Sequence, residues 1–228
     1  MGAFKEIDER IAAWPASFEE LSRTRPAPSE VAAMEEWLGR ALSSKADGVR
    51  ALSDALADGV NPDGACRHPH PSGSMMSLPA LSFAARQGDM AALGALLGAG
   101  ARPDGPEGAK FRPLGLACVN GQAEAVGALL AAGADPDGEP RGDASALEWA
   151  IRMGHGEVAK MVARAGARAG AGACSGGSMS AAEYARDRGS AELAEWLDAF
   201  EGAREERKRI EAQTAPAPSL GKSRPRAL

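Results

Sequence analysis

The chain has 228 residues, of which 44% are hydrophobic and 25% charged, as in ordinary globular proteins. Its net charge of −5 argues against a nucleic-acid partner, because nucleic-acid binding normally requires a basic stripe. No run of about 18 apolar residues is present, so we expect no membrane span.

Residues 1–36 are predicted to form a helical N-terminal extension. Phe4, Ile7 and Ile11 fall at helical spacing, and further apolar residues follow up to Leu38. We expect these helices to cap the open end of the segment that follows. The alternative is an arm that pairs with another chain.

Composition and the first residues also bear on compartment and origin. Glu6 and Asp8 stand where a secretory signal peptide would be basic and then apolar, so we expect a cytoplasmic protein. Secretion by a machine that reads no such signal stays open. Arg outnumbers Lys 20 to 6, which is typical of a GC-rich bacterial coding sequence. The three cysteines have no paired spacing and predict no disulfide.

Residues 37–64 are interpreted as a degenerate first copy of a unit that recurs downstream. The segment 55–64, ALADGVNPDG, repeats the closing segment of the later copies. The loop predicted over 65–77, ACRHPHPSGSMMS, absorbs the extra length before the next copy.

This loop holds the one cluster with metal-ligand character, formed by Cys66, His68 and His70. A thiolate with two imidazoles suits zinc. However, Pro69 and Pro71 keep the segment extended, and a fourth ligand would have to come from elsewhere. We therefore expect a polar loop without metal and keep a metal-binding protein as an alternative.

The middle of the chain is a repeat array. Two glycine series keep one spacing of 33 residues: Gly88, Gly121 and Gly154, and Gly100, Gly133 and Gly166. Two series with the same period across three copies indicate a structural repeat.

Each copy is predicted to contain two short helices. In the central copy, Leu114, Ala117 and Cys118 lie on one face of the first helix, and Gly121 can end that helix with a positive φ. Val126 begins the apolar face of the second helix, and a Pro–Asp–Gly turn closes the copy. Helices this short become stable only by packing against the next copy.

A terminal unit follows at 180–197, and its exposed face is predicted to carry Arg186, Glu192 and Glu195. We place the array at 37–202, with about five repeats of which the first and last are degenerate capping units. Residues 203–228 are expected to form a charged helix end and a disordered tail.

These motifs resemble the ankyrin repeat family. Arg112–Pro113–Leu114–Gly115–Leu116–Ala117 is similar to the family's Thr-Pro-Leu-His-x-Ala opening at Pro113, Leu114 and Ala117. The resemblance implies an all-α ankyrin-repeat solenoid of helix-turn-helix repeats with β-turn fingers. It also implies that a partner protein lies against the concave face, on the turn tips and the ends of the first helices.

Transferred by repeat position, the resemblance gives a set of partner-binding candidates: Met75, Met76, Leu78, Arg86, Gln87, Phe111, Val119, Asn120, Arg141, Arg152 and Met153. Apolar residues at exposed tips suggest a contact patch. For Met75 and Met76, the alternative is that both fold onto the repeat beneath.

We expect a non-catalytic protein without cofactor, because three scattered histidines cannot assemble a Cys–His or Ser–His–Asp site. Its function is predicted to be binding of another protein, as an inhibitor or immunity-type partner. A secreted effector that acts on host proteins is the alternative. A monomer is favoured.

Overall fold

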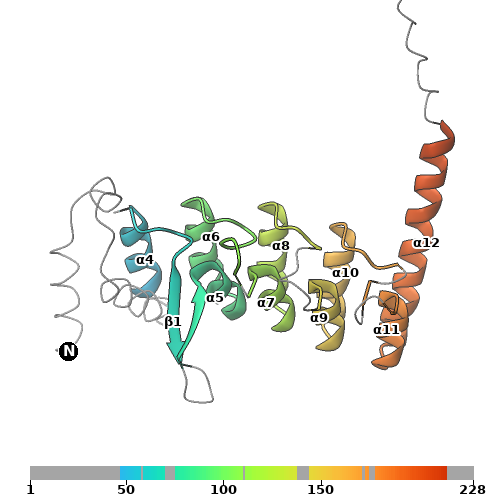
Figure 1. The fold of residues 1–228 in the computed structure, drawn as a ribbon, viewed down its shortest axis with the longest axis horizontal. Coiled ribbons are helices and arrows are strands. Elements are labelled where there is room, and N and C mark those ends of the chain that lie inside the picture. The colour runs from blue at the N-terminus through green and yellow to red at the C-terminus, as the bar shows by residue number, and fades with distance from the viewer. Residues whose placement is uncertain are drawn as a thin grey trace, which may run out of the picture.

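The computed structural model describes residues 47–57, 59–69, 75–109, 111–137, 144–170, 173–174 and 178–214. Helices follow one another in pairs, stacked side by side in a row (Figure 1). The elements in chain order are α4 (Asp47–Ala57), β1 (Ala65–Pro69), β2 (Met75–Pro79), α5 (Ala80–Gln87), α6 (Met90–Gly98), α7 (Pro113–Val119), α8 (Ala123–Ala131), α9 (Ala146–Arg152), α10 (Gly156–Arg164), α11 (Ala181–Asp187) and α12 (Ala191–Thr214).

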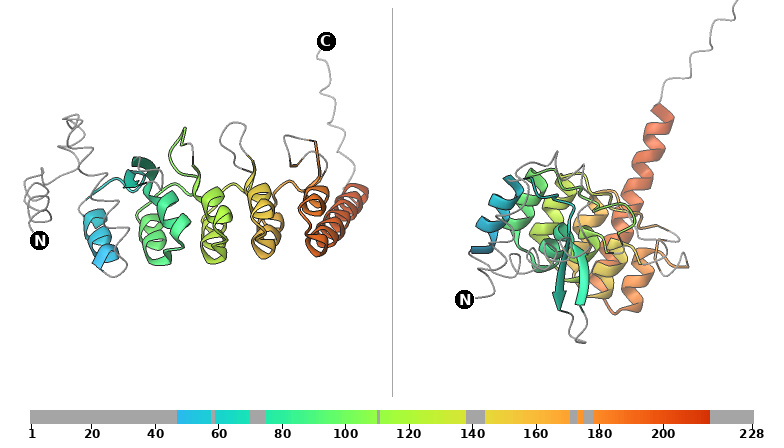
Figure 2. Two further views of the ribbon diagram at one scale, coloured as in Figure 1. Left: turned by 90° about the horizontal axis from the view of Figure 1, so that it is seen from below. Right: turned by 60° about the vertical axis from the view of Figure 1, so that its left-hand side comes forward.

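The helices form two rows. The first helix of each copy (α5, α7, α9, α11) lies in one row, and the second helices (α4, α6, α8, α10) lie in the other (Figures 1 and 2). Consecutive first helices contact each other more closely than consecutive second helices do. The array therefore bends toward the row of first helices, which is its concave side.

Local sequence explains where the short helices begin and end. Pro113 occupies the first turn of α7, where its missing N–H is not needed. Ser145 and Ser180 cap α9 and α11, since each side chain accepts the N–H three residues on. Gly88 ends α5 in the left-handed conformation, with a φ of +69°. The boundaries are thus set locally, while stability comes from the contacts between copies.

The core runs the length of the array between the two rows. It consists mainly of Leu and Ala side chains, including Leu81, Leu93, Leu129 and Leu147, each at most 2% exposed. The alanines allow neighbouring helices to pack closely. The predicted all-α solenoid is confirmed in this architecture.

One segment differs from the expected loop. Residues 65–69 and 75–79 pair as an antiparallel β-hairpin with Ala65 opposite Pro79 and Pro69 opposite Met75. The hairpin projects from the array beside α5 (Figure 1). The prediction of a loop over 65–77 was wrong, because the extended residues 65–69 form backbone hydrogen bonds with residues 75–79 of the same segment.

The array ends in one long helix. α12 continues without a break across residue 202, so residues 203–214 extend the last helix beyond the stack (Figure 2). In the terminal unit, Arg186, Glu192 and Glu195 are exposed, as expected. No helix in the described part of the chain is long and apolar enough to cross a membrane. The predicted N-terminal cap at 1–36 and the tail from residue 215 lie outside the described residues.

Candidate partner-binding surface

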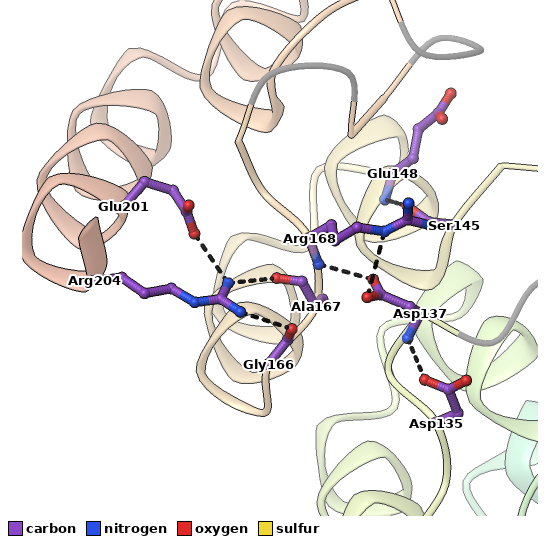
Figure 3. Close-up of polar contacts among 9 residues, drawn as sticks. All are labelled: Asp135, Asp137, Ser145, Glu148, Gly166, Ala167, Arg168, Glu201 and Arg204. Atoms are coloured by element: carbon purple, nitrogen blue, oxygen red, sulfur yellow. Dashed lines mark hydrogen bonds and ion pairs between the residues drawn. The ribbon is translucent and has the colours of Figure 1, made fainter. Parts of the chain in front are cut away.

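Three aspartates tie each turn to the next one along the array. Each carboxylate accepts a backbone N–H from the following copy: Asp63 from Arg102 at 2.9 Å, Asp104 from Asp135 at 3.0 Å, and Asp137 from Arg168 at 2.8 Å. Figure 3 shows the last of these contacts. Repeating the same bond at each step holds consecutive turns at a fixed distance and orientation.

A second kind of contact, a lock between helices of consecutive copies, places a side chain of one copy over a glycine of the preceding copy. The ring of His155 lies over Gly121 of the preceding copy, and its Nε2 is 3.2 Å from the carbonyl oxygen of Val119. One copy earlier, the side chain of Gln122 lies over Gly88 in the same way. Both locks are possible because a glycine leaves room for the side chain of the next copy.

An aromatic and arginine cluster spans α9 and α11. The guanidinium of Arg152 stacks 4.6 Å from the ring centroid of Trp149, and its Nε donates to Tyr184 Oη at 3.1 Å. Its Nη2 also donates to Glu148 Oε1 at 3.0 Å. The hydrogen bond to Tyr184 raises the pKa of Arg152 above its ordinary value, so the side chain stays charged. Arg152 is thus held in one orientation by three neighbours.

Met153 lies at the edge of this cluster, directly after α9. Its side chain is 43% exposed, and the other exposed large apolar residue among the described residues is Ile210 on α12. The surface therefore combines a fixed arginine, a half-buried tryptophan and an accessible methionine, and these residue types are enriched at protein interfaces.

A comparison with known protein families agrees with the repeat period and the paired helices. Residues 81–172 match the family model of ankyrin repeats (3 copies). These residues are an ankyrin-repeat array. No curated protein matches the chain. Ankyrin repeats are in general protein–protein interaction modules and are typically non-catalytic.

Several predicted contact residues lie at the ends of the first ankyrin helices. Gln87, Asn120 and Met153 are exposed, and Arg86, Val119 and Arg152 are half-buried. They recur at the last residues of α5, α7 and α9 or directly after them, so the structure brings them to one side of the array. The side chains of Met75 and Met76, and all of Arg141, lie outside the described residues.

The prediction that Leu78 is exposed at a tip was wrong. It is 1% exposed, because it pairs with Cys66 at the base of the hairpin and both side chains enter the core. Phe111 is half-buried against that core, and its carbonyl accepts the Ser82 hydroxyl at 2.8 Å. An apolar ridge of Leu78 and Phe111 is therefore not a free surface.

Sequence reasoning missed Trp149 and Tyr184. Trp149 occupies the same repeat position as Phe83 and Leu116, each 33 residues apart. Aligning the copies by their glycines would have shown that this position is always large and apolar. Arg152 and Trp149 stand three residues apart on one helix, but the hydrogen bond from Arg152 to Tyr184 needed the structure, because its partners come from two copies.

Of the three candidate zinc ligands, Cys66 is occupied in another contact. The Cys66 side chain is buried, and its Sγ donates to the carbonyl oxygen of Leu78 at 3.2 Å. The described residues hold no group of three metal-ligating side chains. The side chains of His68 and His70 lie outside the described residues.

Proposed function

We propose that this protein binds another protein on the concave side of its ankyrin array, with Trp149, Arg152 and Met153 at the centre of the contact. Tyr184 is 7% exposed and supports this contact by holding Arg152 in place. The observation that carries the proposal is the exposure of Met153, at 43%, directly beside a tryptophan and arginine pair already fixed in place. Large apolar residues at this exposure are rare in the described array.

Arg152 favours binding at this surface because its side chain is ordered before a partner binds. Ordering a long side chain at an interface costs roughly 0.5–1.5 kcal/mol. For Arg152 much of this loss of side-chain freedom occurs on folding, because its hydrogen bonds to Glu148 and Tyr184 order it before a partner binds. Trp, Tyr and Arg also dominate binding energy where they are fixed and surrounded by contacts that exclude water.

The role that we propose for this binding is inhibition of a partner enzyme or toxin in the cytoplasm, by occlusion and without catalysis. A rigid array can cover an active site with little change of its own shape. The Asp137 and His155 contacts, each bridging two copies, support such rigidity.

Site-specific photo-crosslinking in the cells that make the protein tests this proposal. A photoreactive phenylalanine analogue replaces Met153 in one variant and Ala131 in the other. Ala131 is exposed on α8, in the opposite row, and serves as the matched control. We expect a defined adduct from position 153 that position 131 does not give, and loss of that adduct when Arg152 is also changed to Glu.

The identity and activity of the adduct decide the role. Inhibition of the captured enzyme or toxin by the purified protein supports the inhibitor role, whereas an adduct with a host protein after translocation would instead support an effector. The same adducts from both positions, or adducts from position 131 alone, would show that the concave surface is not the contact.

A further inference from the structure

A second charged and aromatic surface lies on the opposite row, where α10 meets α12. Trp196 and Phe200 stack on α12 with ring centroids 4.9 Å apart and planes 12° apart. From α10, the guanidinium carbon of Arg164 lies 5.1 Å from the Trp196 centroid, and the ammonium of Lys160 lies 6.0 Å from it. The indole thus positions two cations on one side of the helix pair.

The cationic surface continues beyond the aromatic pair into a pocket of about 220 Å³. Its charged lining consists of Arg168, Glu201, Arg204 and Lys208. Arg204 is fixed there, because it donates to the carbonyl oxygens of Gly166 and Ala167 at 3.3 and 3.2 Å (Figure 3).

The spacing of these residues makes the surface continuous. On α12, Trp196, Phe200, Arg204 and Lys208 recur every four residues, which places them along one helix face. On α10 and the turn after it, Lys160, Arg164 and Arg168 recur at the same interval. Because Lys160 and Arg164 face Trp196, and Arg204 contacts the turn after Arg164, the two rows run side by side in the same direction.

The surface has an excess of positive charge in a chain with a net charge of −5. Three of its five cations already bind carboxylates: Lys160 binds Glu157 at 2.8 Å, Arg168 binds Asp137 at 3.5 Å, and Arg204 binds Glu201 at 3.3 Å. Within the described residues, no carboxylate lies within ion-pair distance of Arg164 or Lys208. These two cations remain available to an external anion at opposite ends of the surface.

We propose that this α10–α12 surface binds an acidic, extended peptide segment of a partner protein, with an apolar side chain of the peptide against Trp196 and Phe200. The row from Trp196 to Lys208 spans thirteen residues of helix, or about 18 Å between its ends, which matches an extended peptide of about six residues. Carboxylates of the peptide pair with Arg164 at one end and with Lys208 at the pocket.

A nucleic acid fits this surface less well. Nucleic-acid affinity comes from neutralising many phosphates. Here three of the five cations are already bound to carboxylates of the protein itself, and two are left. A short acidic peptide needs only a few cations and also uses the aromatic pair.

Fluorescence anisotropy with the full-length protein tests the proposal. The probe is a labelled peptide of about six residues with alternating Glu and Leu, and a peptide with Lys in place of Glu is its control. The test variant is Arg164→Glu with Lys208→Glu. The matched variant is Arg207→Glu with Arg209→Glu, which makes the same change in net charge at exposed positions of α12 outside the row.

We expect the Glu–Leu peptide to bind and the Lys–Leu peptide not to bind. The test variant should weaken binding about tenfold or more, because two attractive charges become repulsive, while the matched variant changes it less than about threefold. Arg164→Ala with Lys208→Ala should give a smaller loss in the same direction. Circular dichroism verifies that each variant folds, as is expected for exposed substitutions.

Three results would overturn the proposal. The first is no binding of the acidic peptide, and the second is an equal loss in the test and matched variants, which would indicate a diffuse electrostatic effect. The third is tighter binding of a labelled single-stranded oligonucleotide or of phosphatidylserine vesicles than of the peptide.

Discussion

Replacing Gly121 with alanine tests the lock between ankyrin repeats directly. Gly121 has a φ of +66°, and an added Cβ would lie 2.7 Å from both Cε1 and Nδ1 of His155 in the next copy. Gly154 occupies the same position one copy later, with a φ of +79°, but nothing lies within 4 Å of its added Cβ. The pair separates the strain of the backbone from the contact between copies.

The expected loss of stability has two contributions, of which the first is common to both variants. Either substitution forces alanine into the left-handed region, at a cost of about 1–2 kcal/mol. Only Gly121→Ala also displaces the His155 ring from its hydrogen bond to Val119, which is worth about 0.5–1.5 kcal/mol, and disturbs its packing. We therefore expect Gly121→Ala to lower the free energy of unfolding by about 1–1.5 kcal/mol more than Gly154→Ala does.

Urea unfolding followed by far-UV circular dichroism measures both free energies, and unchanged m-values validate the comparison. In a His155→Ala background the excess cost of Gly121→Ala should disappear, since the displaced ring is gone. If the two glycine variants agree within about 0.5 kcal/mol, or if the excess persists without His155, the proposed lock does not exist.

Three further outcomes are expected. Leu129→Ala, at a fully buried position of the central copy, should cost about 2–5 kcal/mol in urea unfolding, and a loss below about 1 kcal/mol would contradict the packing described. The backbone N–H of Ser180 lowers the pKa of Glu183, so this carboxylate stabilises the fold above its unfolded pKa and ceases to do so as pH falls through the lower folded value. Melting temperatures of Glu183→Gln should therefore lie below wild type at neutral pH and converge with it in acid, and a constant gap would refute this. Burial raises the pKa of Cys118 to about 12, so a thiol reagent at neutral pH should label it only after unfolding.

The exposure of some candidate contact residues could be predicted from the sequence and that of others could not, because burial depends on residues far away in the chain. Asn120 and Met153 were placed correctly at exposed ends of first helices, since the glycine that follows each fixes where the helix stops. Leu78 was misplaced because its burial depends on pairing with Cys66, twelve residues earlier in the chain. The orientation of Arg152 depends on Tyr184, which belongs to the next copy.

The sequence by itself determined the repeat, its period, the two short helices of the central copy and the all-α array. These features follow from local rules: glycines allow left-handed helix ends, serines cap first turns, and apolar residues recur at helical spacing. Only the tertiary structure decided which side is concave, which side chains are covered by the neighbouring copy, and where cations meet aromatic rings. Those features arise where two copies touch, and a contact between copies depends on the packing distance and angle of the helices, which no single repeat encodes.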